Sequence, residues 1–266
     1  MVAQGFAQHS RLSAFVRIAA IWIFTALYLF PVVLLQFLTF RLFANASVAP
    51  CVRVYGKFAL WLLGIRLEID GQEVLDDRSA KILVANHSST LDLLILGACF
   101  PTAGMALGKK ELIWVPFIGL AWWAFRQPLV DRGNREKAIR SVERANRVLK
   151  EERRGIWILP EGTRTADGTI GTFKMGAFHM ALASGAPIVP VLIIGAAARL
   201  PKGQWRVCPG VIRVLVREPI DTSEWKRVGL RKRAENLRSW YCQEVAKERK
   251  KMGIDLPVER EEKTQN

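Results

Sequence analysis

The first 65 residues of the chain are dominated by apolar positions. The run 18–40 contains no charged residue, and it is longer than the roughly 20 apolar residues that span the hydrocarbon core of a bilayer. Pro31 lies inside this run and should kink a helix. A second apolar stretch, 58–65, follows. The pattern predicts a membrane anchor over residues 1–65, either one spanning helix or two helices that dip into one leaflet.

From about residue 66 onward, short apolar runs alternate with longer mixed segments. Apolar runs of roughly four to eight residues, bounded by glycine, proline or polar residues, indicate strands. The predicted strands are 66–69, 82–85, 104–107, 128–130, 156–159, 188–194 and 211–216. The predicted helices are 90–99, 135–152, 174–184 and 230–252.

This alternation predicts an α/β domain over residues 66–256, with a mixed, largely parallel sheet flanked by helices. Several predicted strands are apolar throughout, which is typical of a sheet that is covered on both faces. The last segment, 257–266, is rich in charged residues. We expect it to form a solvated tail.

The stretch 112–125 does not fit the core of a soluble protein, because it contains three tryptophans and no charge. One interpretation is a buried hairpin. The interpretation that we favour is an apolar surface in the membrane interface, beside the active site, where a lipid substrate enters.

The formal net charge of +15 is compatible with nucleic acid, an anionic membrane surface or an acidic soluble partner. Nine tryptophans favour the membrane interface. The four cysteines are scattered without a C-x-x-C pair, which argues against a zinc site or a redox dithiol. The basic balance predicts that the domain lies on the cytoplasmic side of the cell inner membrane or of another membrane.

His87 and Asp92 are the most distinctive polar pair of the chain. They lie in the heptapeptide 86–92, directly after the predicted strand 82–85. A histidine and a carboxylate are a general base and its usual orienting partner. Residues five apart share a face neither on one helix nor on one strand. The pair can therefore meet only if a strand ends and a helix begins between them.

The same residues also allow a purely structural interpretation. Ser89 and Asp92 fit a variant of the capping box, in which the carboxylate serves only the start of a helix. On spacing alone, this interpretation and the catalytic one stand equal. A bare H-x-x-x-x-D pattern is weakly specific.

Two further strand ends carry polar groups. The segment 159–165 follows an apolar strand and places Gly162 near Arg164. A glycine lets the backbone approach an anion, and a guanidinium binds that anion bidentately. The segment 130–133 places Asp131 and Arg132 at another strand end. Each could be an ordinary turn, but three such ends together favour a site at the carboxyl edge of the sheet.

Four ordered blocks of this sequence resemble those of the glycerolipid acyltransferases, and most closely the members that acylate 1-acylglycerol-3-phosphate. A further segment, 173–178, is similar to the one that follows the third block in this family. The four blocks are 86–92, 130–132, 160–164 and 188–191.

The resemblance implies acyl transfer from a thioester, acyl-CoA or acyl carrier protein, to the sn-2 hydroxyl of 1-acylglycerol-3-phosphate, which gives phosphatidic acid. In this hypothesis His87 is the base that removes the hydroxyl proton, and Asp92 holds the imidazole in the required tautomer. No metal ion and no bound cofactor are expected. The expected partners are membrane lipids, lysophosphatidic acid and the thioester donor.

Binding the phosphate of the acceptor requires cations and a loop that comes close to the ligand. The residues expected to bind substrate are Lys109, Arg132, Glu161, Gly162, Thr163 and Arg164. Arg164 and Arg132 are the expected phosphate ligands, with Lys109 as a third candidate. Glu161 is expected to contact the substrate or its hydroxyl.

Other functions remain open at this point. The same chemistry can serve another lysophospholipid, a lyso-ornithine lipid or glycerol-3-phosphate. A non-enzymatic basic protein that binds anionic lipid is a rival of a different class. Nucleic acid is not expected as a partner, because no known binding motif emerges. His179 lies in an apolar helical run and is expected to be a packing residue.

Overall fold

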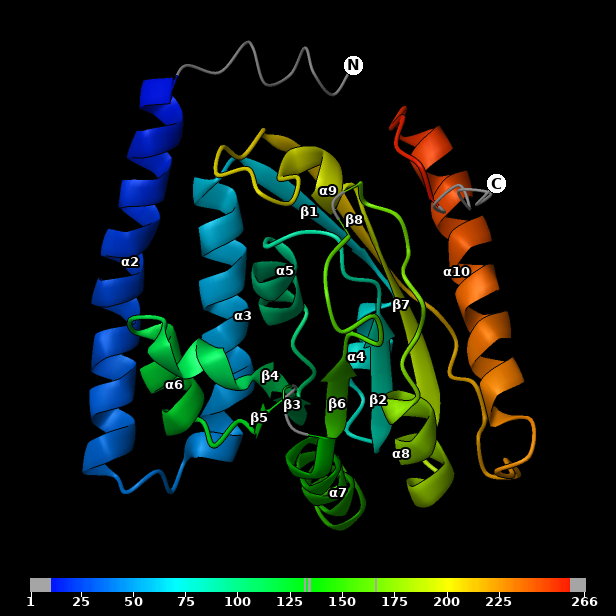
Figure 1. Ribbon diagram of the computed structural model, residues 1–266. Helices are drawn as coiled ribbons and strands as arrows, with labels where there is room; N and C mark the ends of the chain where they lie inside the picture. The colour runs from blue at the N-terminus through cyan, green and yellow to red at the C-terminus, as the bar shows by residue number, and fades with distance from the viewer. Residues whose placement is uncertain (1–10, 132, 134, 166, 259–266) are drawn as a thin grey trace.

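A computed structural model of the protein describes residues 11–258 except 132, 134 and 166, and Figure 1 shows how its elements are arranged. The central sheet has six strands in the order β1-β8-β7-β2-β6-β3. Strands β7 and β8 run antiparallel, and the other neighbouring pairs are parallel. These strands are β1 (Ile65–Asp70), β2 (Lys81–Ala85), β3 (Gly104–Ala106), β6 (Gly155–Ile158), β7 (Ile188–Ile194) and β8 (Gly210–Val216).

This sheet confirms the predicted α/β class and the mixed, largely parallel pairing. The predicted strand 128–130 lies outside the main sheet. Its residues form β5 (Leu129–Val130), which pairs in parallel with β4 (Gly108–Lys109) in a separate two-stranded sheet.

Helices cover both faces of the sheet. Alternate residues of a strand point to opposite sides, and the inner strands are apolar on both sides, so each face has to be covered. On β2, Leu83 and Ala85 face one apolar cluster and Ile82 and Val84 the other. The helices that supply the first cluster are α2 (Arg11–Leu38), α3 (Ala44–Leu62), α5 (Asp92–Ala98) and α6 (Ile118–Ala124). Those that supply the second are α7 (Arg135–Glu151), α8 (Gly176–Ser184) and α10 (Leu230–Lys251). Shorter elements are α4 (Gln72–Asp76), η1 (Lys110–Trp114) and α9 (Ala196–Arg199).

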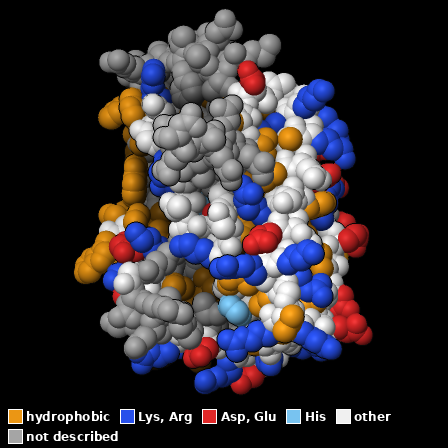
Figure 2. Space-filling model, turned by 45° about the vertical axis from the view of Figure 1, so that its right-hand side comes forward, with side chains coloured by type: hydrophobic (Ala, Val, Ile, Leu, Met, Phe, Trp, Pro, Cys, Tyr) orange, Lys and Arg blue, Asp and Glu red, His pale blue; other side chains and the backbone are white. Residues whose placement is uncertain are grey.

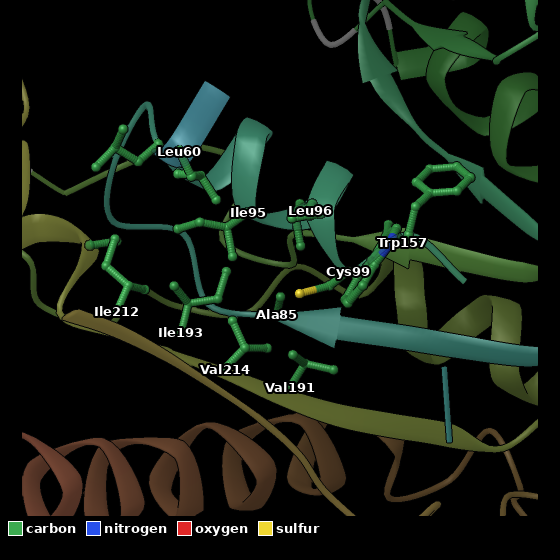
Figure 3. Close-up of a cluster of buried hydrophobic side chains, with 14 of the residues drawn as sticks. Leu60, Ala85, Ile95, Leu96, Cys99, Trp157, Val191, Ile193, Ile212 and Val214 are labelled. Atoms are coloured by element: carbon green, nitrogen blue, oxygen red, sulfur yellow. The ribbon is translucent and has the colours of Figure 1, made fainter. Parts of the chain in front are cut away.

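The first cluster places α5 directly over the strands that lead to the site. Figure 3 shows Leu60 of α3 and Ile95 of α5 above Ala85, Val191 and Ile193 of the sheet. All five side chains are buried. Burial of such side chains contributes about 1.5–3 kcal/mol for each large aliphatic residue, so this layer fixes where α5 begins.

Helices α3 and α5 approach so closely that their backbones touch. A Cβ atom on Gly56 of α3 would lie 2.4 Å from the backbone nitrogen of Ala98 and 2.6 Å from the carbonyl oxygen of Leu94, both on α5. No side chain larger than hydrogen fits there without moving one helix. The N-terminal region is therefore packed directly onto the helix that carries Asp92.

Helix α2 runs without interruption through Pro31 and packs along α3. Among the described helices, α2 is the one long and apolar enough to cross a membrane. Polar contacts tie it to α3, including a 2.9 Å hydrogen bond between the hydroxyls of Thr25 and Tyr55. Its outer side chains are exposed, for example Leu27 at 72%. Figure 2 shows apolar side chains gathered along the edge where α2 lies, beside a face on which Lys and Arg are widespread.

The stretch 112–125 forms most of η1 and all of α6 rather than a hairpin. Its tryptophans are not buried together, since Trp114 is 84% exposed and Trp123 is 45% exposed. Trp123 and Leu120, which is 56% exposed, extend the apolar surface of α2. The structure thus contradicts the buried hairpin and agrees with an exposed apolar surface.

Candidate active site

The carboxyl ends of β2, β6 and β7 meet at one edge because these three strands are parallel neighbours. The loop after β2 contains His87, and the loop after β6 contains Glu161 and Arg164. Ligand sites in α/β sheets lie at this edge. The topology therefore brings together two of the blocks singled out in the sequence.

Asn86 ties the first of these loops to the sheet. Its side chain donates from Nδ2 to the carbonyl oxygen of Ile193 at 3.0 Å, and it accepts from the Ile193 amide at Oδ1 at 2.7 Å. The residue is 1% exposed. An amide side chain that pairs with both groups of one strand residue replaces a ladder contact, so the start of the loop is fixed on β7.

His87 and Asp92 pair as the sequence predicted. His87 Nδ1 lies 2.8 Å from Oδ2 of Asp92. The same oxygen accepts from the amides of Ser88 and Ser89 at 2.8 and 2.9 Å. Asp92 is fully buried, whereas 19% of the His87 side chain is exposed. The buried carboxylate thus orients a histidine whose ring is partly open to solvent.

The structural interpretation of this pair holds only in part. Oδ2 of Asp92 accepts from the Ser89 amide, as the carboxylate of a capping box does, but the Ser89 hydroxyl accepts from the Leu91 amide, and the N-cap of α5 is Leu91, without a side-chain cap. The contact to His87 assigns the hydrogen to Nδ1, which leaves Nε2 free to accept a proton. Asp92 begins α5 and orients the imidazole with the same oxygen.

Glu161 links the two loops through main-chain contacts. Its Oε1 accepts from the His87 amide at 2.7 Å, and its Oε2 accepts from the Gly171 amide at 2.8 Å. Burial raises the pKa of the Glu161 carboxyl to about 7, although both amides favour the charged form. The sequence suggested contact with substrate. In the structure both carboxylate oxygens are engaged by backbone groups.

Arg164 connects the same two loops on their exposed side. Its Nη1 donates to the hydroxyl of Thr90 in the His87 loop. Thr163 is exposed beside it. Gly162 has a φ of +68° in the left-handed region, which favours glycine.

Two lysines that the sequence did not assign to the site lie against this loop. A Cβ atom on Gly162 would lie 2.8 Å from Nζ of Lys174. Lys202 Nζ donates to the carbonyl oxygen of Arg164 at 2.8 Å. Lys174 belongs to the segment 173–178, where the resemblance gave a signal, whereas no sequence signal singles out Lys202. The three cations together make this edge suited to an anion.

Of the other two predicted phosphate ligands, Lys109 and Arg132, the structure describes only Lys109. Lys109 lies on β4, is more than half exposed and pairs with Glu111 at 3.5 Å. Arg132 lies outside the described residues. Its neighbour Asp131 forms a 2.9 Å ion pair with Lys110.

His179 was expected to pack in the core, but it is exposed on α8. The neighbouring Phe178 and Met180 are buried against the sheet. The apolar run is longer than the buried face of this helix, so one polar residue within it points outward.

An apolar cavity of about 90 Å³ lies beside α5, on the side of the anchor helices. Its lining includes Leu29 of α2, Val52 of α3, Leu94 of α5 and Ala121 of α6. The helix that begins at Asp92 therefore also borders an apolar space.

Comparisons with known proteins place this arrangement in a family. A family model described as Acyltransferase matches residues 66–194. The 1-acyl-sn-glycerol-3-phosphate acyltransferase of Salmonella typhimurium is 31% identical over 199 residues, which are 75% of this chain and 80% of that protein. The chain belongs to the acyltransferase family.

Other members of the acyltransferase family show how far the likeness extends. The 1-acyl-sn-glycerol-3-phosphate acyltransferase of Limnanthes alba is 37% identical over 172 residues, which are 65% of this chain and 60% of that protein. The chain thus spans only about 60% of the length of this plant relative. The crystal structure of the 1-acyl-sn-glycerophosphate acyltransferase of Thermotoga maritima is similar with a TM-score of 0.75 and 25% identity. That match covers 90% of this chain and 97% of the other.

The raised pKa of Glu161 generates a stability prediction. Between the ordinary value near 4.5 and about 7, the folded protein holds a proton that the unfolded chain has lost. The carboxyl therefore disfavours folding as the pH rises through this window. We expect the melting temperature of the wild type, measured in detergent, to fall relative to that of Glu161→Gln as the pH rises from about 4.5 to 7. A constant difference across this range would contradict the prediction.

Proposed function

We propose that the protein transfers a fatty acyl group from a thioester to the sn-2 hydroxyl of 1-acylglycerol-3-phosphate, giving phosphatidic acid. The observation that carries this proposal is the 2.8 Å contact between His87 Nδ1 and the buried carboxylate of Asp92 at the carboxyl edge of the sheet. The names of the relatives in the acyltransferase family support the same acceptor.

In the proposed mechanism the acceptor hydroxyl is the nucleophile. Nε2 of His87 takes the hydroxyl proton while the oxygen attacks the thioester carbonyl. The tetrahedral intermediate then collapses, the carbon–sulfur bond breaks, and the thiolate receives the proton from the imidazolium. Asp92 stabilises the imidazolium in between. The substrate hydroxyl stands where a hydrolase has its serine, so the reaction requires neither a covalent enzyme intermediate nor a bound cofactor.

We assign the phosphate of the acceptor to the loop after β6. Arg164 offers a guanidinium at the exposed end of this loop, and Lys174 and Lys202 add charge beside it. Gly162 allows the backbone to come close. In the same proposal, Arg132, Thr163 and Lys109 are further contacts of the substrate. The cavity beside α5 offers an apolar space for a short part of an acyl chain.

We propose that α2 lies in one leaflet and does not cross the bilayer. Arg17 donates to the carbonyl oxygen of Leu63 at 3.2 Å, near one end of the helix pair, and Gln36 donates to the Ser47 hydroxyl at 2.8 Å, near the other. Helix α3 in turn packs on α5. A bilayer-spanning α2 would have to leave these polar contacts or draw α3 into the hydrocarbon. We place the basic domain on the cytoplasmic side.

The catalytic proposal predicts the behaviour of His87→Ala in a transfer assay. Purified protein is supplied with acyl-CoA or acyl carrier protein thioester and with a panel of lysolipids and glycerol-3-phosphate. We expect a loss of about 10²–10⁴-fold in turnover, the range typical of a positioned base. The matched control is His179→Ala on α8, which should keep its activity. Near-normal turnover in His87→Ala would refute the mechanism.

The phosphate assignment predicts that loss of the Arg164 guanidinium weakens binding of the phosphate-bearing acceptor only. Hydrogen bonds to charged groups contribute about 1.5–3 kcal/mol, so Arg164→Ala should raise the KM for 1-acylglycerol-3-phosphate roughly tenfold or more. Transfer to 1-acylglycerol, which lacks the phosphate, should change little. Arg231→Ala on the exposed face of α10 serves as the control for lost charge. An unchanged acceptor KM in Arg164→Ala would exclude the assigned role.

The membrane proposal predicts which side each end of α2 faces. In a background whose four native cysteines are replaced by serine, single cysteines are placed at Val16 and Leu42, which are 56% and 75% exposed near the two ends of the helix, and at Lys232 on α10. In reconstituted vesicles, all three should react with an impermeant maleimide from the same side. Labelling of Val16→Cys and Leu42→Cys from opposite sides would show a spanning helix instead.

A further inference from the structure

Helix α10 lies outside residues 66–194, the region that the acyltransferase family model matches, yet it contacts the sheet directly beneath the site. Tyr241 on this helix is fully buried. Its hydroxyl donates to the carbonyl oxygen of Val84 at 2.5 Å and accepts from the amide of Val191 at 2.9 Å. One side chain of α10 thus bridges β2 and β7.

The position of this bridge follows from the register of the two strands. The Ile82 amide donates to the carbonyl oxygen of Pro187 at 2.9 Å. Two residues further along a parallel ladder, the Val84 carbonyl oxygen faces the Val191 amide. The Tyr241 hydroxyl contacts both groups of this rung, because a hydroxyl can donate and accept at once.

The bridged rung lies immediately before the site loop. Val84 is three residues from His87, and Asn86 between them forms the two hydrogen bonds to Ile193 described above. The end of β2 is therefore joined to β7 by a tyrosine hydroxyl and then by an asparagine amide. Both side chains are buried, so water does not compete for their hydrogen bonds.

A second route leads from α10 to His87. Arg238 lies one turn before Tyr241 and donates to the carbonyl oxygens of Gly171 and Ile170 at 3.0 and 2.9 Å. The Gly171 amide donates to Glu161, whose other carboxylate oxygen accepts from the His87 amide. The two residues of α10 therefore hold the His87 loop from its strand and from its neighbouring loop.

We propose that Tyr241 is a positioning residue for His87, and that α10 is part of the scaffold of the active site. The proposal rests on the transferase function proposed above. Tyr241→Phe keeps the ring in the core but removes the hydroxyl, leaving the Val84 carbonyl and the Val191 amide without it. The end of β2 keeps its parallel pairing with β7 but loses the hydroxyl that bridges the last rungs, and His87 shifts with it. Displacements of about 1 Å can cost roughly 10²-fold in rate.

The test compares Tyr241→Phe with Thr222→Val in the intact chain. Thr222 is 1% exposed and donates from its hydroxyl to the carbonyl oxygen of Ala186 at 2.8 Å, two residues before β7 begins. Each variant removes one buried hydroxyl, and each of these hydroxyls bonds the backbone of β7 or of the residues just before it. We expect both to lower the melting temperature, and only Tyr241→Phe to lower kcat, by roughly 10- to 100-fold, with donor and acceptor KM values within about twofold of the wild type.

A second readout does not depend on the reaction. In a background of His9→Ala and His179→Ala, nitrogen-15 NMR of the remaining histidine reports the Nδ1–H form of His87. Tyr241→Phe should shift or broaden these signals, and Thr222→Val should not. If the wild type transfers no acyl group, the proposed function fails, and the NMR result alone decides the positioning role.

Several results would overturn the positioning role. One is a Tyr241→Phe protein with unchanged kcat and unchanged His87 signals. Another is an equal loss of kcat in Thr222→Val, which would indicate general loosening of the sheet. If Tyr241→Phe does not fold, Arg238→Gln tests the second route, and there an unchanged kcat together with unchanged His87 signals would refute the role of α10.

Discussion

The structure of the site depends on one buried carboxylate oxygen. Oδ2 of Asp92 receives hydrogen bonds from the imidazole of His87 and from the amides of Ser88 and Ser89. A buried carboxylate is costly unless it is well supplied with donors, so the loop must fold tightly around it. Once the loop does so, the ring of His87 has one available orientation and α5 has a defined first residue.

The two loops at the carboxyl edge are mutually dependent. Glu161 holds the backbone of His87 from below, and Arg164 holds Thr90 from the exposed side. The catalytic proposal therefore does not reduce to a pair of side chains. It includes the backbone of the His87 loop, whose amides at His87, Ser88 and Ser89 each donate to a buried carboxylate. It also includes the cationic surface beside this loop. The geometry fits a reaction in which a neutral hydroxyl must be deprotonated while an anionic group is bound nearby.

Much of this could be predicted from the sequence, because the relevant signals are local. Apolar runs located most strands, and polar residues after strands 82–85 and 156–159 located the site. The pairing of His87 with Asp92 was one of two interpretations that the sequence allowed, because a strand end and a helix start between them let the two side chains meet. The contacts of Asn86, Lys202 and Tyr241 could not be predicted, because they depend on which strands and helices are neighbours. A strand order of β7-β2-β6 is a property of the whole chain, and no window of sequence contains it.

The backbone contact between α3 and α5 at Gly56 has a mechanical consequence. Two helices in contact through their main chains behave as one rigid piece, since sliding or tilting either would force atoms to overlap. The apolar surface of α2, the helices α3 and α5, and Asp92 then form a single rigid unit. In a lipid layer, the depth at which α2 settles also sets the height of the imidazole above the hydrocarbon. Under the membrane and general-base assignments proposed above, this rigid packing sets the distance from the membrane surface at which a hydroxyl meets His87.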